Sequence, residues 1–164
     1  MKALLKVLVL SCAVLAWSAG TVHAQAKEKV VLMLNWYLYS EHAPFFIGKE
    51  RGYYDQEGID LDIQEGRGSG VTVQAVAANT ATFGYVDIPT MIKAAAKGAP
   101  VRAVGVVLQL SPMSVMGFAE KNIRTPKDLA GKTVAVTPGD SMSQIWPLFL
   151  KKTGVNETDF KTVA

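Results

Sequence analysis

Aromatic and ionisable side chains crowd into one short stretch, residues 34–46, which directly follows an apolar run. The stretch reads LNWYLYSEHAPFF and contains Trp36, Tyr39, Glu41 and His42. A flat aromatic ligand is held well by stacking on Trp or Tyr, while a few polar groups fix its orientation. Glu41 beside His42 could also act as a general acid–base pair. These residue types therefore indicate either a ligand-binding site or a catalytic one.

The choice between binding and catalysis depends on which partners the stretch has. Beyond the first 24 residues, His42 is the sole histidine and there is no cysteine, and no serine sits in the sharp-turn motif of a nucleophile. A zinc site would require a cluster of such ligands. We therefore expect no catalytic residue, metal ion or cofactor, and we expect His42 to orient a binding site. For Trp36 and Tyr39, packing in the core and stacking on a ligand remain equally open. Tyr37 is expected in the core.

The rest of the chain alternates short apolar strands with helical patterns, which is typical of an α/β fold with a mostly parallel sheet. A half-buried strand is clearest at residues 59–64, where apolar and acidic residues alternate. Long apolar composition also predicts a buried strand at residues 101–110. The full set of expected strands is 29–35, 59–64, 82–86, 101–110, 115–120 and 132–137. The expected helices are 44–57, 71–79, 89–97 and 141–152, with a short capped helix after Thr125.

Parallel sheets of this kind bind ligands in the crevice beyond the carboxyl ends of their strands. Four segments fall there by position: residues 35–42, 66–70, 87–90 and 138–143. We expect acceptor groups at Glu41 or Asp87, and backbone or hydroxyl donors in the glycine-rich turn and at the start of the last helix. The remaining candidate ligand-binding residues are Asn35, Gly68, Ser69, Gly70, Thr90, Asp140, Ser141 and Ser143.

Two of these segments have competing interpretations. The turn 66–70 has glycine at every second position, which suggests a dinucleotide-binding loop, but the third glycine of that motif would fall at Val71. A tight turn near a ligand explains it better. The start of the helix at 141–152 could bind an anionic or acceptor-rich group. It could equally be an ordinary helix cap formed by Asp140 or Ser141.

The N-terminus has the pattern of a secretory signal peptide, with cleavage expected between Ala24 and Gln25. Lys2 and Lys6 precede an apolar run, and Val22-His23-Ala24 supplies the small residues of a cleavage site. Lipid anchoring at Cys12, the single cysteine, is the alternative. The full chain has 17 basic and 14 acidic residues, and cleavage would remove two of the basic ones. The processed chain is therefore near neutral, and it has no basic patch that would indicate nucleic-acid binding.

Three pieces of the sequence together resemble the sulfonate and thiamine-precursor family of periplasmic substrate-binding proteins, whose relatives include the yeast-type thiamine pyrimidine synthase. They are LNWYLYSEHAPFFIGKERGYYDQEGIDLDI, ATFGYVDIPTMIKAAAKGAPV and TPKDLAGKTVAVTPGDS. The resemblance implies a two-lobed fold that closes on its ligand. The first lobe would occupy residues 25–112 after a signal peptide at 1–24. Residues 113–164 would form an incomplete second lobe of a truncated chain.

The resemblance implies a monomeric, exported component of an ABC importer in the periplasm that captures a thiamine pyrimidine precursor and docks on a membrane permease. The alternative is the pyrimidine synthase itself, which uses a histidine and iron. Its donor histidine would align with Thr90, and its cysteine-rich segment would lie beyond Ala164. A sulfonate, nitrate or aromatic-acid binder is the third possibility, for which only Arg67 provides a cation in the cleft segments. We therefore expect a binding protein and not an enzyme.

Overall fold

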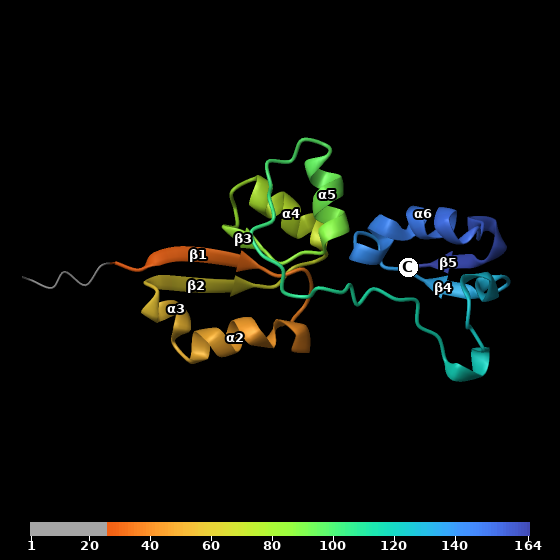
Figure 1. The fold of residues 1–164 in the computed structure, drawn as a ribbon, viewed down its shortest axis with the longest axis horizontal. Coiled ribbons are helices and arrows are strands. Elements are labelled where there is room, and N and C mark those ends of the chain that lie inside the picture. The colour runs from red at the N-terminus through yellow and green to blue at the C-terminus, as the bar shows by residue number, and fades with distance from the viewer. Residues whose placement is uncertain (1–25) are drawn as a thin grey trace, which may run out of the picture.

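The computed structural model describes residues 26–164, so the expected signal peptide and Cys12 lie outside the described residues. The described chain contains two separate parallel sheets, one of three strands and one of two. Figure 1 shows each sheet with its own helices, joined by a long connecting segment. We call these units the first lobe, from β1 to α5, and the second lobe, from η3 to β5. The expectation of an α/β fold with parallel sheets and flanking helices in each lobe is confirmed.

The first sheet has the strand order β2-β1-β3, with β1 (Glu28–Met33) in the centre, β2 (Ile59–Gln64) and β3 (Phe83–Gly84). Strand β2 matches its prediction residue for residue, because alternating apolar side chains suit a strand that buries one face. Val30 pairs with Leu61, and both side chains are buried. The three strands run in parallel, so their carboxyl ends lie at the same edge.

Helices lie on both sides of this sheet (Figure 1). The predicted helix 44–57 is two helices, α2 (Ala43–Glu50) and α3 (Tyr53–Gln56), because Gly52 between them adopts a left-handed conformation with φ 70°. A short 3-10 helix, η1 (Ser40–His42), precedes α2. On the other side are α4 (Ser69–Ala77) and α5 (Ile88–Ala95).

The second lobe packs around its own apolar cluster, in which Leu129, Trp146, Leu150 and Phe160 are buried. Trp146 stacks on Phe149 with ring centroids 5.1 Å apart. The elements of this lobe are η3 (Pro126–Leu129), β4 (Thr133–Ala135), α6 (Ser141–Thr153), η4 (Glu157–Asp159) and β5 (Lys161–Val163), preceded by η2 (Ala119–Lys121).

The connecting segment differs most from its prediction. Residues 101–110 form no strand and are mostly exposed, with Val104 76% and Leu110 86% accessible. Residues 115–120 likewise form no strand, and η2 begins at Ala119. An apolar run becomes a buried strand only where a neighbouring strand pairs with it, and nothing in residues 26–164 pairs with this one. No helix in the described part of the chain has both the length and the apolar character needed to cross a membrane.

Candidate functional site

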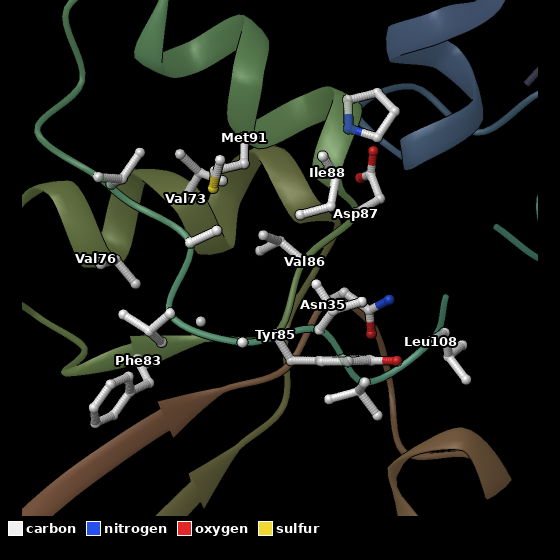
Figure 2. A pocket seen from close by; sticks show the side chains of 18 of the residues that line it. Asn35, Val73, Val76, Phe83, Tyr85, Val86, Asp87, Ile88, Met91 and Leu108 are labelled. Carbon is white, nitrogen blue, oxygen red and sulfur yellow. The ribbon is translucent and has the colours of Figure 1, made fainter. Parts of the chain in front are cut away.

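A cavity of about 630 Å³ opens at the carboxyl ends of β1 and β3, between the first lobe and the connecting segment. Figure 2 shows that its wall of α4 and α5 is apolar, with Val73, Val76 and Met91, whereas Asn35 and Tyr85 place polar atoms at the other end. Glu41 and Asp87 also line the cavity. A mostly apolar cavity with a few convergent polar groups is typical of a site for a small organic molecule. We call Asn35, Glu41, His42 and Tyr85 the polar cluster.

Two tyrosines lie beside the Glu41 carboxylate: Tyr85 of the polar cluster and the neighbouring Tyr39. The Tyr85 hydroxyl donates a hydrogen bond to Glu41 Oε1 over 2.8 Å. Burial and the nearby Glu41 raise the pKa of Tyr39 to about 12, and the same two causes raise the pKa of Tyr85. Both hydroxyls therefore keep their protons at neutral pH and can stabilise the carboxylate. Glu41 is held in place as a hydrogen-bond acceptor on the cavity wall.

His42 is buried beside this carboxylate, with 1% of its surface accessible. Its Nε2 lies 2.8 Å from Asn35 Oδ1, and its ring makes edge contacts with Tyr39 and Tyr85 at centroid distances of 4.5 and 5.9 Å. Since an amide oxygen can only accept, Nε2 carries the proton in this arrangement, and Nδ1 has no hydrogen-bond partner among the described residues. Burial lowers the pKa of His42, although the Glu41 carboxylate opposes that shift. His42 is thus a neutral hydrogen-bond donor to Asn35.

Acidification is expected to destabilise the protein through His42. An unfolded histidine takes up a proton below its ordinary pKa of 6.5, whereas the folded one resists protonation. The unfolded state then binds more protons, so the free energy of unfolding decreases as the pH falls from 6.5 towards the folded-state pKa. Urea unfolding between pH 7 and 5 should show this slope, and His42→Gln should reduce it. An equal slope in that variant would contradict the assignment. The pKa values of Asp87 and Asp128 lie below the ordinary 3.8, so these two carboxylates affect the free energy of unfolding only at pH values below this range.

Of the aromatic residues that follow β1, Tyr37 differs from its prediction. Tyr37 is not in the core: it is 46% exposed, and the Arg67 guanidinium stacks on its ring at 4.0 Å. Cation–π stacking explains why an exposed tyrosine is retained in a defined position. Trp36 is half-buried and contacts the edge of Tyr37 at 5.5 Å, and Tyr39 is 45% exposed. Neither Trp36 nor Tyr39 lines the cavity itself.

The glycine-rich turn, residues 66–70, is hydrogen-bonded to the backbone next to the polar cluster. Gly66 N donates to Trp36 O, and Gly68 N donates to Asn35 O at 2.9 Å. A Cβ on Gly66 would lie in direct overlap with Leu34 O, so only glycine fits at this close approach. Gly70 is already within α4 and has ordinary contacts. The turn therefore fixes the backbone at Asn35 and Trp36.

A second group of polar side chains joins the two lobes at the starts of α4, α5 and α6. Ser69 Oγ lies 3.0 Å from Ser141 Oγ and accepts a hydrogen bond from Asp87 N at 3.2 Å. Asp87 Oδ1 caps α5 by accepting from Thr90 N at 3.0 Å. Burial raises the pKa of Asp87, but nearby hydroxyls, above all that of Ser141, and the Thr90 N–H outweigh it and lower the pKa overall. Asp87 stays charged in a buried junction between the lobes.

The start of α6 has the geometry of an ordinary helix cap. Asp140 Oδ1 accepts from Ser143 N at 2.6 Å, and the Ser143 hydroxyl donates back to Asp140 O at 2.8 Å. Both side chains are therefore occupied within their own turn. Gly139 touches the first lobe, because a Cβ on Gly68 would lie 2.6 Å from Gly139 O. Of the predicted residues in this segment, Ser141 is the one brought to the junction.

Sequence reasoning missed Tyr85 and the contribution of residues 100–113 to the cavity wall. Tyr85 directly follows β3, so its place at the carboxyl end of a parallel strand was the signal that could have found it. The described residues contain no group of three or more His, Cys, Asp or Glu side chains that could hold a metal ion. They do not by themselves fit an iron centre, and Thr90 at the expected donor position is 4% exposed and has a hydroxyl with no partner in this part of the chain.

Comparison with known proteins places the chain among thiamine-related proteins. A family model described as NMT1/THI5 like matches residues 39–164. A 4-amino-5-hydroxymethyl-2-methylpyrimidine phosphate synthase from Legionella pneumophila is 30% identical over 84% of this chain and 43% of its own length. A formylaminopyrimidine-binding protein from Halalkalibacterium halodurans is 33% identical over 67% of this chain and 33% of its own.

A solved structure from Bordetella bronchiseptica RB50 shares the fold, with a TM-score of 0.58, 24% identity, and coverage of 84% of this chain and 44% of that one. The chain therefore spans less than half the length of these matched proteins. The prediction that the protein is not an enzyme is wrong as it stands. A relative matched over most of the chain carries a synthase name, and so does a further one from Schizosaccharomyces pombe, 24% identical over 83% of the chain.

Proposed function

Because the chain belongs to the NMT1/THI5-like family, whose members act in thiamine pyrimidine metabolism, we propose that its cavity binds a 4-amino-2-methylpyrimidine ring. The observation that carries this proposal is the polar cluster. It places two polar groups in the lining of an otherwise apolar cavity: the Glu41 carboxylate, which accepts from the Tyr85 hydroxyl, and the Asn35 amide, which is paired with His42. An exocyclic amine can donate to Glu41 while the apolar wall of α4 and α5 covers the face of the ring.

The balance of charge around the cavity supports a ligand that is rich in donors. Glu41 and Asp87 are the two acidic residues in the lining, and Arg102 is the one basic residue among the described residues that line it. An acidic rim favours amines and disfavours sulfonate or nitrate. The third possibility from the sequence, an anion-binding member of the same fold, therefore has less support than the aminopyrimidine.

Two roles are compatible with such a site, and the names of the relatives favour the first. In a synthase role, the described residues would hold the pyrimidine while the chemistry uses groups supplied elsewhere. This role has support from relatives that carry the synthase name and match 83–84% of the chain. In an importer role, an exported protein would deliver the pyrimidine to an ABC permease. The formylaminopyrimidine-binding relative and the signal-peptide pattern favour this second candidate.

Titration calorimetry with 4-amino-5-hydroxymethyl-2-methylpyrimidine tests the shared step. We expect saturable binding, with taurine and nitrate giving no heat at the same concentrations. Binding of the anions without the pyrimidine would overturn the proposal. Cell fractionation and an assay for pyrimidine phosphate formation then separate the roles: a periplasmic location without turnover favours the importer, and turnover favours the synthase.

A further inference from the structure

The hydrogen bond between His42 and Asn35 has a consequence for ligand choice. Asn35 has two ends that look alike in shape, and only its surroundings decide whether the oxygen or the NH₂ group points at the cavity. His42 Nε2 lies 2.8 Å from Oδ1, so the oxygen end of the amide faces His42 inside the protein. Figure 2 shows Asn35 and Tyr85 among the residues that line the cavity. The NH₂ group lies on the other side, where one hydrogen is within reach of the Tyr39 hydroxyl and the second is left for a ligand.

We propose that His42 is a positioning residue that locks the Asn35 amide with its NH₂ group towards the cavity, so that the site presents a donor at Asn35 beside an acceptor at Glu41. This inference rests on the proposed function and specifies its ligand class. A fitting ligand carries a ring nitrogen that accepts next to an exocyclic amine that donates. A 4-aminopyrimidine has this edge, whereas a 4-oxopyrimidine presents the reverse pattern, an N–H beside a carbonyl oxygen.

Three features hold His42 in the required state. Its burial keeps the ring away from water, and edge contacts from Tyr39 and Tyr85 fix the ring plane. Its Nδ1 has no partner among the described residues, so nothing there competes for the proton that Nε2 donates. A buried nitrogen without a partner costs free energy in a fold. That cost is consistent with a residue kept for orientation and not for packing alone.

The test compares the preference for two ligands in variants of the whole chain. The ligands are 4-amino-5-hydroxymethyl-2-methylpyrimidine and its 4-oxo analogue. We expect the wild type to prefer the amino compound by at least about tenfold, the factor that one matched hydrogen bond to a charged or buried group provides. In His42→Leu the Asn35 amide can turn freely, so the preference should fall to about twofold or less. In His42→Gln a side-chain N–H remains to hold Oδ1, so the preference should return.

A purely structural role for His42 would lower stability without changing this preference. Val30→Ala is the matched control, because Val30 is buried in β1 but does not line the cavity. It should unfold at a lower temperature and keep the wild-type preference. If His42→Leu behaves like Val30→Ala, the proposal is overturned. Asn35→Asp, which exchanges the NH₂ donor for an acceptor of the same shape, should lose the preference even if His42→Leu fails to fold.

An NMR measurement without ligand keeps the two proposals separate. The ¹⁵N shifts of the His42 ring should show the proton on Nε2, with a coupling across the hydrogen bond to the Asn35 side chain. A proton on Nδ1 would overturn the positioning role whatever the protein binds. If the wild type binds neither pyrimidine while the NMR result holds, the proposed function fails and the amide orientation stands.

Discussion

Replacing Glu41 with glutamine should weaken binding of 4-amino-5-hydroxymethyl-2-methylpyrimidine by about 10- to 100-fold. Hydrogen bonds to a charged group contribute about 1.5–3 kcal/mol, and each 1.4 kcal/mol is a factor of ten in affinity. Glutamine keeps the shape of the side chain but removes the charge that accepts from the ligand amine. The NH₂ group of the glutamine could also face the ligand amine, which would place two hydrogen-bond donors against each other. Titration calorimetry at pH 7 measures the effect.

The contacts of Glu41 supply a graded series for the same experiment. Tyr85→Phe removes the hydroxyl that donates to Oε1 at 2.8 Å but leaves the carboxylate, so its loss of affinity should be smaller, about three- to tenfold. Glu65→Gln is the matched control, since Glu65 accepts from Leu38 N in the neighbouring loop and does not line the cavity. A Glu41→Gln variant that binds as tightly as Glu65→Gln would remove Glu41 from the site.

The elements with a strong local pattern were predictable from the sequence. Strand β2 has a strict apolar–acidic alternation, and α6 begins after a capping Asp140 and ends at Gly154 in a left-handed conformation. Such signals are contained within a few neighbouring residues, so they need no knowledge of the tertiary structure. The segment 101–110 has the composition of a strand, yet composition cannot specify a partner strand, and the described chain provides none.

The candidate site was predictable in its members but not in its contacts. Asn35, Glu41 and His42 fall at the end of a predicted strand, which is why sequence position identified them. The pairing of Glu41 with Tyr85 joins residues 44 positions apart, and the stacking of Arg67 on Tyr37 moved that ring out of the expected core. These contacts follow from how β1, β3 and the glycine-rich turn are brought together. The contacts and the exposure of the side chains therefore required the fold, whereas the position of Asn35 and Glu41 after the first strand did not.

Gly66→Ala should be the most damaging single substitution near the site, lowering the free energy of unfolding by about 3 kcal/mol. A Cβ at Gly66 would overlap the Leu34 carbonyl oxygen and would also lie 3.0 Å from Thr72 Oγ1, which donates to that same oxygen at 2.7 Å. The obstacle is backbone of a residue with no accessible surface, so no side chain can turn aside to make room. The turn and the end of β1 must separate instead.

That separation would reach the ligand site, because Gly66 N donates to Trp36 O and Gly68 N donates to Asn35 O. We therefore expect Gly66→Ala to lower the unfolding temperature by on the order of 10 °C, and to weaken aminopyrimidine binding. Gly70→Ala is the control within the same sequence motif: its Cβ would meet nothing closer than 3.8 Å, and alanine favours the helix it joins. Scanning calorimetry of the two variants decides the matter. Equal unfolding temperatures would mean that the turn is not packed against β1, and the support it gives to Asn35 would then have to come from His42 alone.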